Sequence, residues 1–413
     1  MKKQSRIIFL GAQVRRQQIT ITKACSSRRS VAGAEANRYT SKYEGKIMNI
    51  AKVEVIPFGV PIKNFADAYT GFSVSNAVLV KIIAEDGTIG YGEACAWEPE
   101  FYGETLESVA STISRYMTPI IIGENAFNIN RIMAKIDANI ARITCAKEGI
   151  DLALHDLKGK LLKTPVYNVL GGSFRETIPV ASEIGIDTPE AMAENALAVL
   201  ELGIRVIKIK GSDDMKLDVK RIKTVREAVG SEIELRLDPN AAWTTIGTIK
   251  IMKEIEDCNL QLLEQPVPSW DLKGMSHIRN NIGIPLMADE SIWTPQDVIK
   301  IAEYGAADII NIKIAKSCGL ALAKQIEFVA ESQGLPCIVG TEIEPGFSLV
   351  AKLHLAASMK IHPLASEFTE LSLLKGNILK YKFEIKEGCV KVPDGPGFGV
   401  ELDEQYFEKV IIK

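Results

Sequence analysis

Three acidic residues follow short apolar runs at a nearly constant spacing. Asp238 ends "ELRLD", Glu264 ends "LQLLE" and Asp289 ends "PLMAD", at separations of 26 and 25 residues. A strand, a loop, a helix and a second loop need about that length, so we expect the acids at equivalent places on successive strand–helix units. Carboxylates gathered at one edge of a parallel sheet repel one another unless a cation lies between them. Oxygen ligands without His or Cys favour Mg²⁺, with Mn²⁺ as the alternative.

Lysines stand on both sides of these acids in the chain. Lys210 in "VIKIK" precedes Asp238 by 28 residues, and Lys313 in "IINIK" follows Asp289 by 24. We therefore expect Lys210 and Lys313 to flank the acids, where one amine can remove a proton α to a carboxylate and the other can return one. Lys208 shares a strand face with Lys210, and a neighbouring like charge is predicted to lower the pKa of Lys210.

Two smaller expectations concern neighbouring residues. Asn240, two residues after Asp238, is predicted to add a peripheral contact to the cation or the substrate, with a turn-forming role as the alternative. Lys316 is predicted to be a loop cation rather than a catalyst.

The elements that must position these residues divide the chain into parts. Residues 48–172 combine strand-like runs with helical spacing and predict an α+β domain. Residues 173–372 alternate β-rich runs with amphipathic helices, and eight such strands would close a parallel barrel whose carboxyl-terminal mouth carries the chemistry. Residues 373–413 return to strand and turn signals and are expected to run back over the first domain.

The first 47 residues differ in composition from the rest. They hold eleven Lys or Arg and only two acids. We expect a disordered extension without chemistry, either an upstream segment from a misassigned start or an organelle transit peptide. An organelle location is expected only in the second case.

Overall composition excludes several classes of partner. The formal net charge is −3 and no apolar run is long enough to cross a bilayer, so we expect neither nucleic acid nor membrane as a partner. The seven cysteines are scattered without a CxxC pair, which favours reduced thiols in a cytoplasmic compartment.

Several segments together resemble a known family. "VIKIKG", "LRLDPNAAW", "LLEQPVP", "MADES" and "NIKIAKSCGL" resemble the enolase superfamily in its muconate lactonizing enzyme subgroup, and the likeness extends from Met48 to the end of the chain. The resemblance implies an α+β capping domain and a modified (β/α)7β TIM-type barrel. It also implies Mg²⁺ on Asp238, Glu264 and Asp289, acid/base chemistry by Lys210 and Lys313, and a homo-oligomer between dimer and octamer.

Sibling subgroups can be compared on strands seven and eight. The seventh strand, "PCIVGTEIE", has no His, which disfavours mandelate-racemase-like chemistry. Glu367 in "ASEFTEL" stands where muconate cycloisomerases place a Glu that hydrogen-bonds the substrate, so the resemblance assigns it a catalytic role. The same segment lacks the Asp-x-Asp of dipeptide epimerases, which weakens that alternative. Glu344 is expected to face the site ahead of Glu342.

Specificity is expected to come from the capping domain. Two segments, "KNFADAYTGFS" and "AWEPEFYGE", connect strands that close over the barrel in this family. The candidates for an apolar pocket wall are Tyr69, Phe72, Trp97 and Phe101.

These observations predict an isomerase that forms an enolate from a small carboxylate or amino-acid derivative, by cycloisomerase or by racemase/epimerase chemistry. Dipeptide epimerase and hydroxy-acid or hydroxyproline dehydratase remain alternatives on the same scaffold. From other classes, a Schiff-base lysine aldolase and a non-catalytic binding barrel are the rivals. Neither explains three acids in periodic register.

Overall fold

The computed structural model describes residues 47–96, 99–361 and 364–412. The basic N-terminal segment and Trp97 lie outside these residues, so the expectations for them stay predictions. Among the described residues, none of the helices has the length and apolar character needed to cross a membrane.

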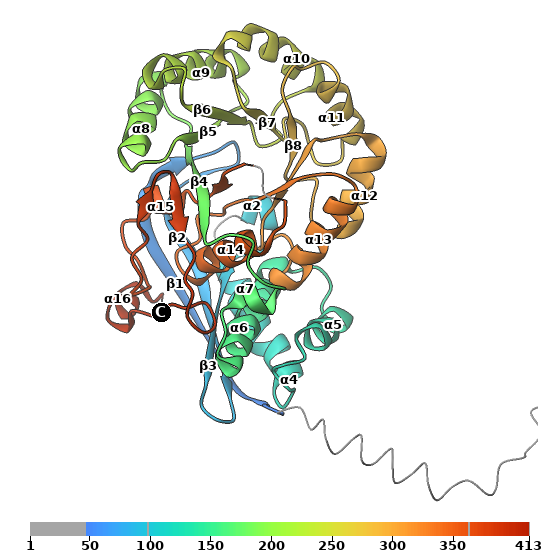
Figure 1. Ribbon diagram of the computed structural model, residues 1–413, viewed down its shortest axis with the longest axis vertical. Coiled ribbons are helices and arrows are strands. Elements are labelled where there is room, and N and C mark those ends of the chain that lie inside the picture. Colours follow the sequence, from blue (N-terminus) through green and yellow to red (C-terminus); the bar gives the residue numbers. More distant parts are fainter. Residues whose placement is uncertain (1–46, 97–98, 362–363, 413) are drawn as a thin grey trace, which may run out of the picture. The chain divides into compact units, whose positions relative to one another are not determined.

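The N-terminal part is a three-stranded antiparallel sheet covered by helices (Figure 1). Strands β1 (Ile50–Ala66), β2 (Gly71–Ala84) and β3 (Ile89–Cys95) lie in sequence order. The longest helix, α6 (Thr144–Leu162), packs closely on β3, because a Cβ at Gly92 would lie 2.1 Å from the carbonyl oxygen of Gly149. The shorter helices are α2 (Pro99–Tyr102), α3 (Leu106–Thr112), α4 (Thr118–Ile121), α5 (Ile129–Asn139), α7 (Val166–Val169) and the π-helical turn η1 (Ile113–Met117).

Eight parallel strands form a barrel, as the alternation of strand and helix patterns predicted. They are β4 (Thr177–Ile184), β5 (Val206–Lys210), β6 (Glu234–Asp238), β7 (Leu262–Glu264), β8 (Leu286–Ala288), β9 (Ile309–Ile312), β10 (Cys337–Val339) and β11 (Ser366–Glu367). Each strand from β4 to β10 pairs with the next one along the chain, and β11 pairs with β4. The backbone N–H of Val339 donates to Ser366 Oγ at 2.8 Å, which joins β10 to β11.

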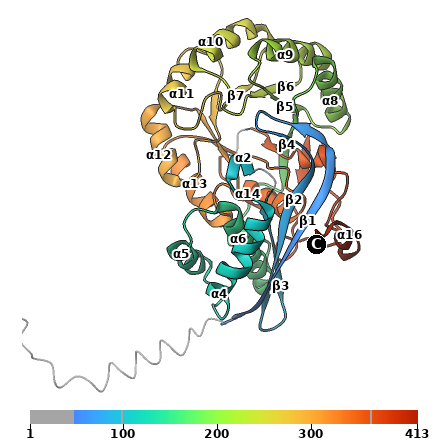
Figure 2. The same cartoon turned by 180° about the vertical axis from the view of Figure 1, so that it is seen from behind.

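Seven helices surround these strands (Figures 1 and 2). They are α8 (Pro189–Glu201), α9 (Met215–Val229), α10 (Thr245–Glu254), α11 (Leu272–Arg279), α12 (Pro295–Tyr304), α13 (Leu320–Ser332) and α14 (Phe347–Ser358), with a 3-10 turn η2 (Glu256–Cys258) after α10. The side chains of Thr188, Asp214 and Asp271 each accept a hydrogen bond from the backbone at the start of α8, α9 and α11, which fixes where these helices begin. A strand without a following barrel helix, β11, completes the (β/α)7β order that the resemblance implied.

The C-terminal segment contacts both parts. It contains α15 (Glu370–Leu373), the hairpin β12 (Ile385–Lys386) and β13 (Cys389–Lys391), and α16 (Glu404–Val410). Strand β13 pairs antiparallel with β4 of the barrel. The ring of Phe407 in α16 packs edge-on against Phe58 of β1, with 5.3 Å between ring centroids.

A buried cluster of carboxylates joins the capping domain to the barrel. Glu93 Oε2 accepts from the backbone N–H of Phe347 at 2.9 Å, and Glu148 Oε1 accepts from Ser348 Oγ at 3.2 Å. Lys352 forms ion pairs with Glu344 and Glu370 at 2.7 and 2.6 Å. Burial, together with the charge of Glu344, raises the pKa of Glu93 to about 8.

The raised pKa makes stability fall as pH rises. Folded Glu93 keeps its proton up to about pH 8, whereas in the unfolded chain it ionises near 4.5, so unfolding releases a proton between those values. Replacing Glu93 with Gln should therefore make the free energy of unfolding fall less steeply over that range, by about 1.4 kcal/mol per pH unit. Urea unfolding at pH 5.5, 6.5 and 7.5 measures the slope, with the exposed Glu194→Gln on α8 as the control. An unchanged slope in Glu93→Gln would show that another group carries the proton.

Candidate active site

The three periodic acids lie side by side at the carboxyl-terminal mouth of the barrel. Asp238 ends β6, Glu264 ends β7, and Asp289 directly follows β8. Lys210 of β5 is the register partner of Asp238. The side chains of all three acids are fully buried. Regular strand–helix units thus bring together residues more than twenty positions apart.

Lys208 lies at the centre of this group. Its Nζ is 2.7 Å from Glu183 Oε1, 2.9 Å from Glu264 Oε2, 2.9 Å from Glu367 Oε1 and 3.4 Å from Asp238 Oδ2. The side chain is fully buried. An ammonium group surrounded by four carboxylates serves as a fixed counter-charge, and these carboxylates raise its pKa although burial alone would lower it.

Lys210 and Lys313 face one pocket from opposite sides of the acids in strand order. Lys210 Nζ is 2.8 Å from Asp238 Oδ2 and 3.5 Å from Glu183 Oε1. Lys313, directly after β9, has its Nζ 3.0 Å from Asp289 Oδ2 and 2.9 Å from Glu342 Oε1. Each lysine therefore has one partner among the three periodic acids and one outside them.

The expected lowering of the Lys210 pKa is wrong in its net direction. Burial lowers the pKa of Lys210, and the charges of Lys208 and Lys313 lower it further. The charges of Asp238 and Glu183 outweigh these effects and hold the pKa above its usual value. The sequence argument counted the neighbouring ammonium group and omitted the carboxylates that the barrel brings within reach.

The carboxylates themselves shift in two directions. Burial raises the pKa of Asp289, but Lys313 and Lys316 lower it more, so the net shift is downward, and Asp238 behaves alike through Lys210 and Lys208. Burial raises the pKa of Glu264 well above its usual range, because Lys208 offsets only part of that cost and neighbouring acids add to it. Burial and the charge of Asp289 raise the pKa of Glu290 to about 8.

The site holds more negative than positive groups. Its seven carboxylates are Glu183, Asp238, Glu264, Asp289, Glu290, Glu342 and Glu367, and its five cations are Lys208, Lys210, Arg236, Lys313 and Lys316. Glu290 Oε2 and Asn240 Oδ1 are buried and accept no hydrogen bond. An excess of two negative charges, on oxygen donors alone, fits one divalent cation such as Mg²⁺.

The acids do not yet converge on one point. Across residues 47–96, 99–361 and 364–412, no three Asp, Glu, His or Cys side chains are arranged as ligands of a single ion. Each periodic acid is instead drawn to a lysine. Small side-chain rotations away from Lys208, Lys210 and Lys316 would be needed for Asp238, Glu264 and Asp289 to share a cation.

The pocket over the two lysines is closed by the capping domain. Its lining comes from β1 and the β1–β2 connection, from α2, and from the barrel mouth: Phe65, Asp67, Tyr69, Phe101, Glu183, Lys210, Asn240, Lys313, Thr341, Glu342 and Ile343. The hydroxyl of Tyr69 donates to Glu290 Oε1 at 3.1 Å, which connects the cap directly to the residue after Asp289.

A second cavity of about 410 Å³ continues from this pocket towards the outside. Tyr69, Phe101 and Asn240 line both, and Trp293 lies in the outer one. The rings of Phe101 and Trp293 are stacked with centroids 5.8 Å apart, and Tyr69 meets Phe101 edge-on at 5.6 Å. These rings give the outer cavity an aromatic wall suited to an apolar part of a ligand.

The structure places four expected residues differently. Phe72 packs against Phe65, with 5.5 Å between ring centroids, and does not line the pocket. Glu344 is ion-paired with Lys352 below the mouth, and Glu342 lines the pocket in its place. Glu367 contacts Lys208 and the amide of Asn311 and lies beneath the pocket. Lys316 is fully buried and ion-paired with Asp289, so it is not a loop cation.

Two site residues that the sequence argument missed carried a usable signal. Glu183 on β4 precedes Lys210 by 27 residues, which is the same period as the acids. Glu342 follows Lys313 by 29 residues and belongs to the next unit. Extending the period in both directions would have found both. Trp293 and Tyr102 carry no such signal, because they reach the mouth from a loop and from the cap.

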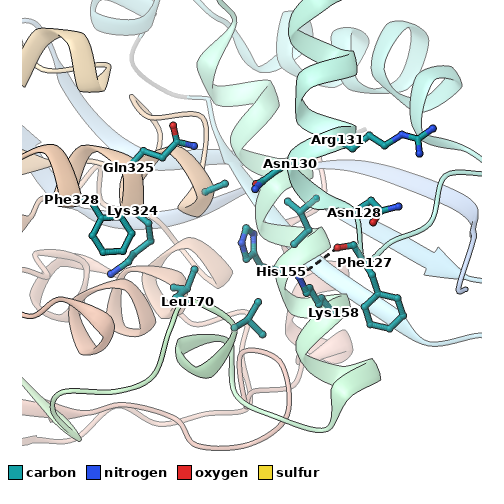
Figure 3. A pocket seen from close by; sticks show the side chains of 13 residues that line it. Phe127, Asn128, Asn130, Arg131, His155, Lys158, Leu170, Lys324, Gln325 and Phe328 are labelled. Atoms are coloured by element: carbon teal, nitrogen blue, oxygen red, sulfur yellow. Dashed lines mark hydrogen bonds between the residues drawn. The ribbon is translucent and has the colours of Figure 1, made fainter. Parts of the chain in front are cut away.

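A larger cavity of about 650 Å³ lies elsewhere, between α5, α6 and α13 (Figure 3). Its lining includes Arg131, His155, Lys158 and Lys324 and none of the mouth acids. Lys324 is ion-paired with Glu327, and His155 with Asp151. This cavity therefore lacks the cation ligands and the paired lysines that define the candidate active site.

Two family models cover most of the chain. The "Mandelate racemase / muconate lactonizing enzyme, N-terminal domain" model matches residues 50–171, and the "Enolase C-terminal domain-like" model matches residues 191–406. The second match contains every barrel-mouth acid and lysine described above except Glu183.

Characterised relatives match over nearly their whole length. An L-Ala-D/L-Glu epimerase of Clostridium acetobutylicum is 34% identical, over 86% of this chain and 99% of its own. An N-succinyl-L-Arg/Lys racemase of Bacillus cereus is also 34% identical, over 88% and 98%. Muconate cycloisomerase 1 of Rhodococcus opacus is 30% identical, over 86% and 96%.

Solved structures agree with these matches. The crystal structure of N-succinyl Arg/Lys racemase from Bacillus cereus superimposes with a TM-score of 0.84 at 32% identity, covering 89% of this chain and 99% of that one. A dipeptide epimerase from Cytophaga hutchinsonii, complexed with Mg and the dipeptide D-Ala-L-Val, gives 0.83 at 29% identity, covering 88% and 98%. The chain therefore belongs to the mandelate racemase/muconate lactonizing enzyme family of the enolase superfamily, as an isomerase of its muconate lactonizing enzyme subgroup.

Proposed function

We propose that this isomerase inverts the α-carbon of an N-acylated amino acid or a similar small carboxylate, using Lys210 and Lys313 as the two proton-transfer groups. The observation that carries the proposal is the placement of both lysines in the wall of one pocket, each held by its own acids. A single base would suffice for an elimination. Two amines reaching one pocket from different strands suit removal of a proton on one side and its return on the other.

The steps follow from this arrangement. The neutral amine of one lysine takes the α-proton, and the C–H electron pair moves into the carboxylate to give an enolate. The ammonium group of the other lysine then donates its proton to the opposite face of the same carbon. The product is the opposite stereoisomer, and the two lysines have exchanged protonation states.

We infer that Asp238, Glu264 and Asp289 would hold the cation, Mg²⁺ in preference to Mn²⁺. A divalent ion there supplies positive charge next to the substrate carboxylate and lowers the energy of the enolate. Lys208, with Glu183 and Glu367, keeps the remaining buried charge balanced around these ligands. Asn240, whose Oδ1 accepts no hydrogen bond, is placed to contact the substrate or the cation's shell.

The pocket supports an acylated substrate over one with a free amino group. The two acids around β11, Glu367 and Glu370, are ion-paired with Lys208 and Lys352, and neither lines the pocket. No carboxylate from this strand is thus directed at a substrate ammonium group. The aromatic wall of Tyr69, Phe101 and Trp293 suits an apolar side chain or acyl group.

Assembly and location complete the proposal. We expect a homo-oligomer, dimer to octamer, which size-exclusion chromatography with light scattering measures directly. We also expect a reducing, cytoplasmic compartment, because the six cysteines within the described residues form no disulfide.

The test is α-proton exchange with a substrate library. Purified protein with Mg²⁺ in D₂O is incubated with N-acylamino acids, dipeptides, muconates and hydroxyprolines, and mass spectrometry reports incorporation of one deuterium. Exchange with inversion of an N-acylamino acid is the expected result. Exchange confined to free dipeptides would overturn the substrate class, and absence of exchange across the library would overturn the proposal.

Cycloisomerization is the second candidate, because a muconate cycloisomerase matches over most of the chain. It needs only one proton-transfer lysine and consumes a muconate to give a lactone. Loss of muconate absorbance without deuterium at a stereocentre separates it from racemization, and loss of water from a hydroxyproline would identify a dehydratase.

A further inference from the structure

The capping helix α2 contacts one of the two lysines through two neighbouring side chains. The ring of Phe101 lies with its centroid 5.1 Å from Lys313 Nζ. The hydroxyl of Tyr102 donates to Glu342 Oε1 at 2.7 Å, and the same oxygen lies 2.9 Å from Lys313 Nζ. The cap thus touches Lys313 directly through a ring face and indirectly through a carboxylate.

Lys210 is held differently. Its ion pairs are to Asp238 and Glu183, which come from barrel strands β6 and β4. The described contacts of Lys210 include none to α2. The two proton-transfer groups of one reaction are therefore supported by different parts of the molecule, Lys210 by the rigid barrel alone and Lys313 by the barrel and the cap.

Glu342 needs an outside support because of the chain around it. Ile343 has a φ of 54°, in the left-handed region that a branched residue rarely adopts, and the segment after β10 is not a regular strand. Backbone geometry alone therefore does not fix where the Glu342 carboxylate points. The hydrogen bond from Tyr102 supplies one fixed point, and the ion pair to Lys313 supplies a second.

We propose that Tyr102 is a positioning residue that acts through Glu342 to hold Lys313, and not Lys210, in its reactive place. The inference rests on the proposed two-lysine function and deepens it. Its consequence is that the two faces of the substrate depend unequally on the cap. Misplacing one catalytic group by about 1 Å can reduce a rate by about 10²-fold.

Exchange and inversion report this inequality separately. Inversion requires both lysines, so a defect in Lys313 lowers it equally in both directions. Exchange with retention requires only the lysine facing the α-proton of the stereoisomer supplied. A Lys313 defect therefore lowers exchange from one stereoisomer and leaves exchange from the other intact.

The experiment measures deuterium exchange from each stereoisomer of a wild-type substrate, in D₂O with Mg²⁺, for Tyr102→Phe and Glu342→Gln. Lys210→Ala and Lys313→Ala first identify which stereoisomer each lysine serves. Tyr116→Phe, the same chemical change at an exposed position of the capping domain, is the matched control. Thermal melting confirms that each variant is folded, and Glu342→Gln tests the proposal independently if Tyr102→Phe does not fold.

We expect Tyr102→Phe and Glu342→Gln to reduce exchange from the Lys313 stereoisomer by about 10- to 100-fold and from the Lys210 stereoisomer by less than about threefold. Equal losses for both stereoisomers would mean that Tyr102 only stabilises the pocket, and no loss would mean that Lys313 needs no such support. Either result overturns the inference. Absence of exchange in the wild type would instead count against the proposed function.

Discussion

Replacing Lys313 with alanine should abolish inversion in both directions, by about 10³-fold or more, while exchange with retention from one stereoisomer continues. Replacing Lys210 should give the mirror result with the other stereoisomer. A positioned acid or base contributes about 10²- to 10⁴-fold to a rate, and inversion needs both groups. The measurement is the initial rate of optical change together with deuterium content by mass spectrometry, on each pure stereoisomer.

The control for this pair is Lys300→Ala, an exposed lysine on α12 that is ion-paired with Asp297. Melting curves show whether loss of a buried ammonium group has unfolded the protein, and Lys→Met variants at 210 and 313 preserve volume if alanine does. Inversion at the wild-type rate in either lysine variant would refute the two-lysine scheme. Loss of exchange from both stereoisomers in both variants would point to a different base.

Replacing Glu264 with glutamine should remove the response of the protein to Mg²⁺. A ligand present at 100 times its dissociation constant stabilises the folded state by about 2.7 kcal/mol, which for a chain of this size corresponds to a melting shift of roughly 5 °C. We expect that shift in the wild type and little in Glu264→Gln. We also expect turnover to fall by at least about 10³-fold, because charge stabilisation by the cation accounts for several kcal/mol.

The matched control is Glu327→Gln. Glu327 is also a buried glutamate paired with a lysine, Lys324, but it lies far from the mouth on α13. This variant should change the melting temperature while keeping the Mg²⁺ shift. A wild-type protein without any Mg²⁺ shift, or a Glu264→Gln variant that keeps it, would contradict the assignment of the ligand.

The arrangement of the mouth followed from periodicity, because parallel strands of a barrel place equivalent positions at one edge. Asp238, Glu264 and Asp289 needed no other information. The partner of each charge could not be predicted in this way. Lys208 meets four carboxylates from four other strands, and only the closed barrel determines which of them are within 3 Å or so of its ammonium group.

Glu342 and Glu344 show a second limit. Residues two apart in a regular strand share a face, so the sequence suggested that both could point into the site. The left-handed backbone at Ile343 separates them, and Glu342 reaches Lys313 while Glu344 reaches Lys352. Nothing in the residue type of an isoleucine announces that conformation. Local backbone geometry decided which of two similar acids belongs to the pocket.

The contact between α16 and β1 has a consequence for synthesis in the cell. Phe58 near the start of the capping sheet is fully covered, and its edge-on partner Phe407 stands within the last seven residues of the chain. The backbone N–H of Ile412 also donates to the carbonyl of Pro57. A nascent chain still attached to the ribosome cannot complete this packing, so the sheet made first must wait for the end of translation before its outer face is sealed.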